Sequence, residues 1–441
     1  MRKIFIIMTV ALGVALGAQA QQSAELAALQ QQLNELSAKI AQLEKANAEK
    51  TVVAEQAVQL ENANAAKIAQ IEQDNAKKTW SIEQLQAEGK KDEAASWAND
   101  IKLAGDIRAR YEKRESYKAD GTINDKDRQR IRLRVGAYGK VNDFTDFGLR
   151  LATGGSRTSS NSDLGDSGNS TTTASGMKDI WLDQAYVDMH PELLGGAHLF
   201  LGKMPQPWIT YGSGLIWDTD LNPEGAALTY EKQFIPFKLK ANAGSFVMRE
   251  NNLTQDIQLW SGQVALEKAV GPGTLTMGVS DYYFDNANSG GANNLSGSGV
   301  LNTDVQKGTT NQFHLVEGFG SYGFTAFKLP VLLMGQYVVN TEAINGSEDT
   351  AYLTGITIGK AKEKGSWEIG YSWRDIGRYA VVAGLNDSDF AGETWAGCRG
   401  HRFSGKYQVF KNMSADLAYI LSTDWKGRDA NTLQADLNFK F

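Results

Sequence analysis

The chain has 441 residues, of which 42% are hydrophobic and 22% are charged, with a single cysteine and a formal net charge of −6. This length supplies ample core, so a small fold stapled by disulfides is excluded. The mild acidity argues against a basic nucleic-acid binder. After the first twenty residues, no apolar run approaches the roughly 18 to 20 residues of a membrane-spanning helix. These bulk figures are typical of a soluble protein, but the local patterns along the chain indicate a different class.

The first twenty residues have the pattern of a secretory signal peptide. Arg2 and Lys3 form a basic start, residues 4–17 are apolar, and Ala18-Gln19-Ala20 is a small-residue cleavage site. The apolar stretch is too short to span a bilayer, which disfavours the alternative of a retained anchor helix. We therefore expect residues 1–20 to be a signal peptide and the rest of the chain to be exported.

Residues 21–88 are predicted to form an α-helical coiled coil. Its first heptad a and d positions hold Leu26, Leu29, Leu33, Leu36, Ile40 and Leu43. The register continues through a more polar middle, and the segment contains no Pro or Gly. Because such a helix is unstable alone, we expect a self-associating periplasmic arm, with a solvated single helix or a disordered linker as the alternative. Residues 89–100, which begin with Gly89, are expected to be a linker.

From residue 101 the hydrophobic period changes to two, which predicts an all-β domain over residues 101–441. In one clear run, Ile131, Leu133 and Val135 alternate with arginines. Similar alternation recurs in runs of about ten residues to the end of the chain. That length is close to what a tilted membrane-spanning strand requires.

The connections between these runs alternate in length, with a short one followed by a long one. Short ones include 140–144 and 410–412, whereas long ones include 154–178, 205–224 and 376–400. Tight turns that alternate with long loops are the layout of an antiparallel outer-membrane β-barrel, with the turns in the periplasm. The count gives about 16 strands, although residues 317–329 are hard to assign from the pattern.

The final strand is the most specific local signal. The chain ends with Leu433, Ala435, Leu437, Phe439 and Phe441 on one face and polar residues between them. An outward apolar face suits lipid, and the polar face suits a wet interior. A terminal aromatic on an alternating last strand resembles the sorting signal of bacterial outer-membrane barrels.

A central stretch resembles a known family. Residues 199–230 read LFLGKMPQPWITYGSGLIWDTDLNPEGAALTY, in which Gly202-Lys203, Pro207-Trp208 and the run 218–225 carry the pattern. The stretch is similar to the putative-porin family of Gram-negative outer membranes, whose pattern also covers residues from about 100 to 441 and includes a coiled-coil prefix. The resemblance implies a diffusion pore in the outer membrane, a trimer, and no enzymatic chemistry.

The predicted inward face is rich in arginine. By strand parity, the pore-lining set is Arg108, Arg110, Arg128, Arg130, Arg132, Arg134 and Arg150. A lipid-facing Arg near the bilayer midplane costs about 2 to 4 kcal/mol, so this row must face water. One interpretation is a Lys/Arg-lined channel that attracts anions. The other, equally weighted, is that the row pairs with carboxylates of neighbouring strands or of a folded-in loop.

The third long loop, 205–224, is predicted to fold into the channel as a constriction. Unlike the other loops it has large apolar residues, which should pack against the wall. The constriction residues are expected to be Trp217, Asp218, Asp220, Asn222 and Glu224, with the acids facing the arginines. The alternative is a surface loop whose Asp218 and Asp220 bind a cation or cap a turn, although Pro223 stands where a calcium loop needs Gly.

Competing functions remain open at this point. The four histidines lie on separate segments and no catalytic or phosphate-binding motif is present, so we expect neither an enzyme nor a cofactor. The favoured hypothesis is an outer-membrane porin that passes small solutes or ions, surrounded by lipid and assembled as a homo-oligomer, with a trimer expected. The alternative is a membrane anchor whose coiled coil contacts the cell wall or another partner.

Overall fold

A computed structural model describes residues 34, 37, 67, 70, 100–117, 121–156, 158–165, 178–212, 214–252, 254–287, 303–304, 309–310, 312–343, 348–391 and 396–441. The chain divides into two units, Met1–Ser96 and Trp97–Phe441. The predicted signal peptide, linker and coiled coil lie outside the described residues, except for Asp100 and four isolated helical positions. Among the described residues, no helix is long and apolar enough to span a bilayer.

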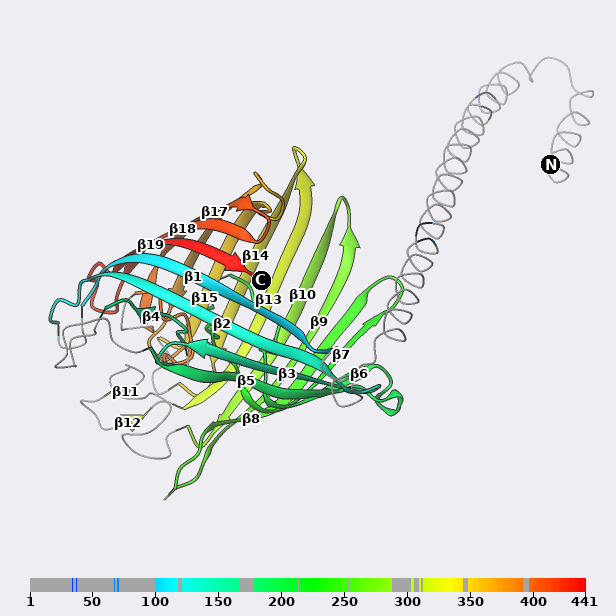
Figure 1. Cartoon of the computed structure of the whole chain (residues 1–441), viewed down its shortest axis with the longest axis horizontal. Coiled ribbons are helices and arrows are strands. Elements are labelled where there is room, and N and C mark those ends of the chain that lie inside the picture. Colours follow the sequence, from blue (N-terminus) through cyan, green and yellow to red (C-terminus); the bar gives the residue numbers. More distant parts are fainter. Residues whose placement is uncertain are drawn as a thin grey trace, which may run out of the picture. The chain divides into compact units, whose positions relative to one another are not determined.

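The second unit is an antiparallel β-barrel (Figure 1). Its strands are β1 (Lys102–Glu115), β2 (Lys126–Asn142), β3 (Thr145–Thr153), β5 (Ile180–Met189), β6 (Ala197–Lys203), β7 (Glu224–Gln233), β8 (Lys238–Arg249), β9 (Ile257–Val270), β10 (Gly273–Asp285), β13 (Phe313–Ala326), β14 (Leu329–Asn340), β15 (Thr350–Gly359), β16 (Trp367–Ile376), β17 (Cys398–Phe410), β18 (Met413–Thr423) and β19 (Asn431–Lys440). The short strand β4 (Ser162–Asp163) pairs with β2, β11 (Thr303–Asp304) pairs with β12 (Thr309–Thr310), and Glu192–Leu194 form a 3₁₀ turn. The predicted barrel of 16 strands is confirmed.

The first and last strands close the barrel. β19 pairs with β1 in a register that sets Phe439 opposite Ile107, and Figure 1 shows the two strands side by side. The terminal Phe441 accepts a hydrogen bond from the Gly105 amide at 2.9 Å and donates its own amide to the Gly105 carbonyl at 3.0 Å. Closure removes the free edges that an open sheet would expose.

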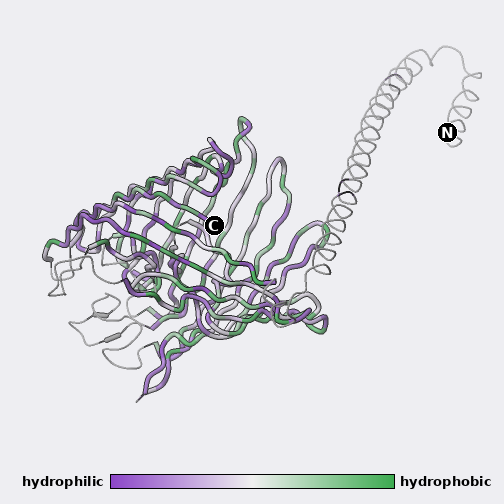
Figure 2. The backbone as a smooth tube through the Cα atoms, in the orientation of Figure 1, coloured by the Kyte–Doolittle hydropathy of each residue, from purple (hydrophilic) through white to green (hydrophobic). Residues whose placement is uncertain are grey.

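The two faces of the wall differ in chemistry, as the sequence period predicts. On β2 and β19, outward Val135 and Leu437 are 40% and 42% exposed, whereas inward Arg110 and Glu112 of β1 are 7% and 0% exposed. In Figure 2 hydrophobic and hydrophilic residues alternate along the strands. An apolar outer band around a polar interior is the arrangement expected of a barrel in lipid.

The segment that the pattern did not assign, 317–329, contains a two-residue turn. β13 ends at Ala326, and Phe327 and Lys328 then turn the chain with φ of 52° and 66° before β14. Two successive positive φ values normally select Asn and Gly in a hairpin, so Phe-Lys gives no recognisable turn signal. The pattern of long loops in the sequence also did not identify the connections 250–256 and 424–430, because both are short for that side of the barrel.

Candidate functional site

The third long loop, 204–223, lies between β6 and β7 and packs inside the barrel. Trp208, Leu215 and Trp217 are 6%, 1% and 2% exposed. The two indoles stack with centroids 4.4 Å apart, and Trp217 meets Tyr282 of β10 edge-on at 5.1 Å. Burial of a large apolar side chain stabilises by about 1.5 to 3 kcal/mol, so these contacts hold the loop against the inner wall.

The neck of this loop is formed by the residues that carried the family resemblance. Lys203 pairs with Glu224 in the β6–β7 register, and their Nζ and Oε1 atoms lie 2.5 Å apart. The adjacent Gly202 and Gly225 pair with each other at φ of 116° and 158°. A residue with a Cβ is strained at Gly202, so glycine permits the chain to leave the wall there.

Glu224 therefore does not reach the arginines, because its carboxylate is held by Lys203. Trp217 lies in the apolar interior, in agreement with the expectation that the large apolar residues of this loop pack against the wall. The acidic residues of the loop that lie in the barrel interior are Asp218 and Asp220, with Asn222 beside them.

Asp220 joins the third loop to the wall of the barrel. Its Oδ1 atom lies 3.7 Å from Arg134 and 3.9 Å from Arg132, both on β2. Its Oδ2 atom accepts hydrogen bonds from the amide and hydroxyl of Ser160 in the second long loop at 3.0 and 2.9 Å. Burial opposes ionisation, but Arg132 and the Ser160 amide outweigh it and hold the pKa of Asp220 below its usual range.

Asp218 has a different environment, since it contacts no arginine among its described partners. Its carboxylate accepts hydrogen bonds from the amides of Ser388 at 3.0 Å and Asp220 at 2.8 Å. Burial, followed by the nearby charge of Asp387, raises the pKa of Asp218 to about 8. Asp218 therefore joins two loops and adds little negative charge near neutral pH.

Asn222 is held by a β-bulge in β5. The β3–β5 register shifts between Arg150 and Leu151, so that Asp183 is the extra residue. Asp183 and Gln184 then both bond the Asn222 side chain, at 2.9 and 2.8 Å. A β-bulge changes the face on which a side chain lies, so two successive residues can both point inward, and the hydrophobic period of the sequence does not predict it.

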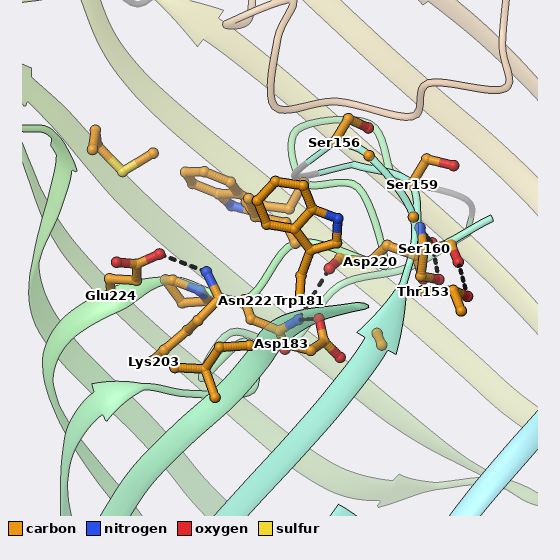
Figure 3. Close-up of a pocket in the computed structure, with 18 of the residues that line it drawn as sticks. Thr153, Ser156, Ser159, Ser160, Trp181, Asp183, Lys203, Asp220, Asn222 and Glu224 are labelled. Atoms are coloured by element: carbon orange, nitrogen blue, oxygen red, sulfur yellow. Dashed lines mark hydrogen bonds and ion pairs between the residues drawn. The ribbon is translucent and has the colours of Figure 1, made fainter. Parts of the chain in front are cut away.

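These groups surround a cavity of about 400 Å³ between the third loop and the wall (Figure 3). Figure 3 shows Trp181 of β5 at its centre, with Asp183 and Asn222 below the indole, Asp220 beside it near Ser160, and the Lys203–Glu224 pair on the other side. Arg150, one of the predicted pore-lining residues, contacts the wall of this cavity through its Nε atom, which lies 2.5 Å from the Asp183 carboxylate.

The predicted arginines lie together on β1, β2 and β3, and Arg114 joins them. We call these eight residues the arginine wall; they are Arg108, Arg110, Arg114, Arg128, Arg130, Arg132, Arg134 and Arg150. Arg108 lies opposite Arg132 and Arg110 opposite Arg130 in the strand register. Like charges directly opposite each other are destabilising, so the wall requires carboxylates between them.

Those carboxylates come from strands and from loops. Asp106 bonds Arg132 and Arg134 at 2.8 and 2.7 Å, and Glu112 bonds Arg128 at 2.5 Å. Within the described part of the chain, the ion pairs of the arginine wall involve Asp106, Glu112, Asp183 and Asp436 on strands and Asp163, Asp220 and Asp389 on connections. Strong pairing is therefore the rule for these arginines, as one of the two interpretations from sequence expected.

The seventh long loop, 377–397, also packs inside the barrel, a role that was not predicted from the sequence. Val381, Leu385 and Phe390 are each at most 1% exposed and belong to the same apolar cluster as Trp208 and Trp217. The Leu385 carbonyl accepts the Asp218 amide at 2.6 Å. An apolar run over residues 379–383 is the signal that could have identified this loop, because the same feature marked the third loop.

Asp387 and Asp389 lie at the polar tip of this loop. Asp387 pairs with Arg374 of β16 at 3.2 Å, and Arg374 also stacks over the ring of Phe390 at 4.2 Å. Asp389 lies 3.1 Å from Arg110 and 3.8 Å from Arg114. Burial opposes ionisation of Asp389, but these two arginines hold its pKa well below the usual range.

A cation site at Asp218 and Asp220 was the alternative role expected of this loop. Within the described ranges, no group of three or more His, Cys, Asp or Glu side chains is arranged to hold a metal ion. The carboxylates of Asp218 and Asp220 are instead engaged by backbone amides, a hydroxyl and arginines.

Comparison with known proteins gives a family match over part of the chain and a similar fold. Residues 113–314 match the family described as putative porin, which confirms the resemblance drawn from residues 199–230. No curated protein sequence matches the chain.

Several solved structures resemble the barrel. OprB of Pseudomonas putida is 12% identical over 78% of this chain and 95% of that one, with a TM-score of 0.53. The outer membrane channel DcaP of Acinetobacter baumannii is 14% identical over 78% and 97% of the two chains, with a TM-score of 0.43. OmpF of Salmonella typhi is 11% identical over 77% and 97%, with a TM-score of 0.46. At such identity, the likeness to OprB concerns the fold alone.

Proposed function

We propose that this chain, whose residues 113–314 match the putative porin family, forms a water-filled diffusion channel for small hydrophilic solutes and ions in the outer membrane of a Gram-negative cell. The observation that carries the proposal is the closed barrel with apolar residues outside and the arginine wall inside. A barrel of 16 strands is wide enough to enclose an aqueous lumen.

The third loop is the constriction in this proposal. Its buried tryptophans fix it inside the barrel, and Asp220 approaches Arg132 and Arg134 from the loop side. Opposed charges at close range create a transverse field, which orders water and selects among solutes.

The proposed selectivity is a modest preference for anions. The arginine wall has eight cations, and the carboxylates paired with it in the described residues number seven, which leaves an excess of one positive charge. Because the excess is small and exposed charges are screened by salt, we expect a weak bias rather than exclusion of cations.

The proposed domain organisation rests on the sequence. The chain would consist of a signal peptide over residues 1–20, a periplasmic coiled coil over residues 21–88, a linker over residues 89–100 and the barrel over residues 101–441, and it would assemble as a trimer. The heptad pattern that begins at Leu26 also supports the second candidate, an anchor whose coiled coil contacts the cell wall. Both roles are compatible in one molecule.

Conductance separates the two candidates. The full-length mature protein, added to a planar bilayer, should give ohmic steps of uniform size, and deletion of residues 21–88 should leave the steps while removing the trimer band on heat-modifiable electrophoresis. Silence in the bilayer, together with co-sedimentation of the protein with isolated cell wall, would favour the anchor and contradict the channel.

A further inference from the structure

We propose that the tip of the seventh loop is a second constriction element and that Asp389 is a selectivity-determining residue of the channel. The inference rests on the proposed channel function. It adds to the predicted third-loop constriction a separate segment of chain, 377–397, whose charge acts on a different part of the arginine wall.

The arginines of the wall all lie on strands, whereas the carboxylates that pair with them come from both strands and connections. The strands contribute the eight arginines and four of their carboxylates, so the wall by itself has an excess of four positive charges. The remaining three carboxylates arrive on three different connections, as Asp163 of β4 in the second long loop, Asp220 of the third and Asp389 of the seventh. Among the described residues, each of these three connections therefore contributes one carboxylate, and together they neutralise most of a strongly anion-attracting surface.

Asp389 is placed for this role by contacts that fix its loop. Leu385 and Phe390, four residues before and one after it, are each 1% exposed in the apolar cluster that the third loop shares. Next to Asp389, the Ser388 amide bonds Asp218 at 3.0 Å and the Ser388 hydroxyl bonds the Thr158 carbonyl at 2.9 Å. The tip is thus connected to the second and third loops and is held as part of one unit.

Asp389 also keeps contact with solvent, which selectivity requires. Its side chain is 24% exposed, whereas its partners Arg110 and Arg114 are 6% and 7% exposed. A permeating ion approaching this part of the wall therefore meets the carboxylate before the guanidinium groups. Asp387, by comparison, is directed to Arg374 and serves to hold the loop.

Removal of this charge should have a measurable effect. A unit charge about 6 Å from an ion in water changes the Boltzmann weight of that ion about threefold, and less at high salt. Because loss of the charge favours chloride and disfavours potassium by about the same factor, Asp389→Asn should raise the ratio of chloride to potassium permeability by up to about tenfold at low salt. Asp389→Glu keeps the charge and should leave the ratio close to that of the wild-type protein.

The experiment measures reversal potentials across a planar bilayer under a KCl gradient, with full-length protein and both variants. The matched control is Asp429→Asn, which removes the same charge from an exposed residue of the loop 424–430. Heat-modifiable migration of each variant reports that the barrel has folded. A larger permeability ratio in Asp389→Asn alone supports the proposal.

Two results would overturn it. If wild-type channels conduct and Asp389→Asn has the same ratio as Asp429→Asn, Asp389 does not set selectivity although the channel function stands. If Asp389→Asn conducts more but keeps the ratio, the residue only holds the loop. Absence of any conductance in the wild-type protein would instead contradict the proposed function itself, and this inference with it.

Discussion

Asp220 and Arg134 lie 3.7 Å apart, although one belongs to the loop between β6 and β7 and the other to β2. The contact is long for a salt bridge, and the Arg134 Nε atom is bonded more closely to Asp106 at 2.7 Å. Asp220 is therefore one carboxylate among several around a row of arginines, and its electrostatic effect extends over the row rather than to a single partner.

Removal of the Asp220 charge should increase the preference for anions. Asp220→Asn changes the excess charge around the arginine wall from one to two, so the chloride to potassium permeability ratio should rise by up to about tenfold at low salt and by less at high salt. Reversal potentials in a KCl gradient measure the change. Glu224→Gln is the control, because that carboxylate pairs with Lys203 instead of the wall; equal shifts in both variants would contradict the role of Asp220.

Loss of arginines should reverse the preference. In the double variant Arg132→Gln, Arg134→Gln, the seven carboxylates outnumber the six remaining arginines, and the channel should become weakly selective for cations. The same reversal-potential measurement applies. Lys411→Gln, at an exposed residue of the β17–β18 turn, should change nothing, and a double variant that still prefers anions would show that the wall does not govern selectivity.

The third loop should loosen when its aromatic contacts are removed. Trp217→Ala leaves a cavity beside Trp208 and Tyr282, and such truncations typically destabilise by about 3 to 5 kcal/mol. We expect a lower midpoint in chemical unfolding followed by tryptophan fluorescence, and noisier, larger single-channel steps. Trp181→Ala is the control, since that indole is 55% exposed. Identical behaviour of the two variants would argue against anchoring by Trp217.

Asp218 should make the contact between the third and seventh loops sensitive to pH. Burial and the neighbouring charge of Asp387 raise the pKa of Asp218 to about 8 in the folded protein, from about 3.8 when unfolded. The folded state thus holds the proton more tightly, so this group is most favourable to folding below pH 4. Its contribution falls between pH 4 and pH 8, by at most about 1.4 kcal/mol per pH unit.

Asp218→Asn is the variant that tests this dependence. The free energy of unfolding of wild-type and variant barrels would be compared from pH 4 to pH 9, and the difference between them should change steadily over that window and level off above about pH 8. A pH-independent difference would show that Asp218 titrates normally. Asp220, whose pKa is held low, should give no such trend when replaced by Asn.

Much of the barrel follows from a single feature of the sequence. Alternation of Ile131 and Leu133 with arginines fixes which face of β2 is wet, and the requirement that charges avoid lipid then places the whole row inside. The apolar residues of the third loop also predict that it packs inside, since Trp208 and Trp217 need a buried surface. Both features can be predicted because the alternation within one strand, or the apolar content of one loop, is visible in the local sequence.

The parts that could not be predicted depend on contacts between distant segments. Asp389 reaches Arg110 across 279 positions of the chain, and no spacing or motif indicates that pairing. Asp183 faces inward only because a bulge shifts the register of β5, whereas strict alternation would place it outside. Glu224 was expected near the arginines on charge alone, but its position opposite Lys203 at the neck of the loop decides its partner.

Recording from single channels tests the central claim most directly. Purified full-length protein in a planar bilayer should give stable ohmic steps, with a reversal potential in a KCl gradient that corresponds to a weak preference for chloride. A folded, heat-modifiable barrel that produces no conductance steps would contradict the proposal that this chain is a diffusion channel.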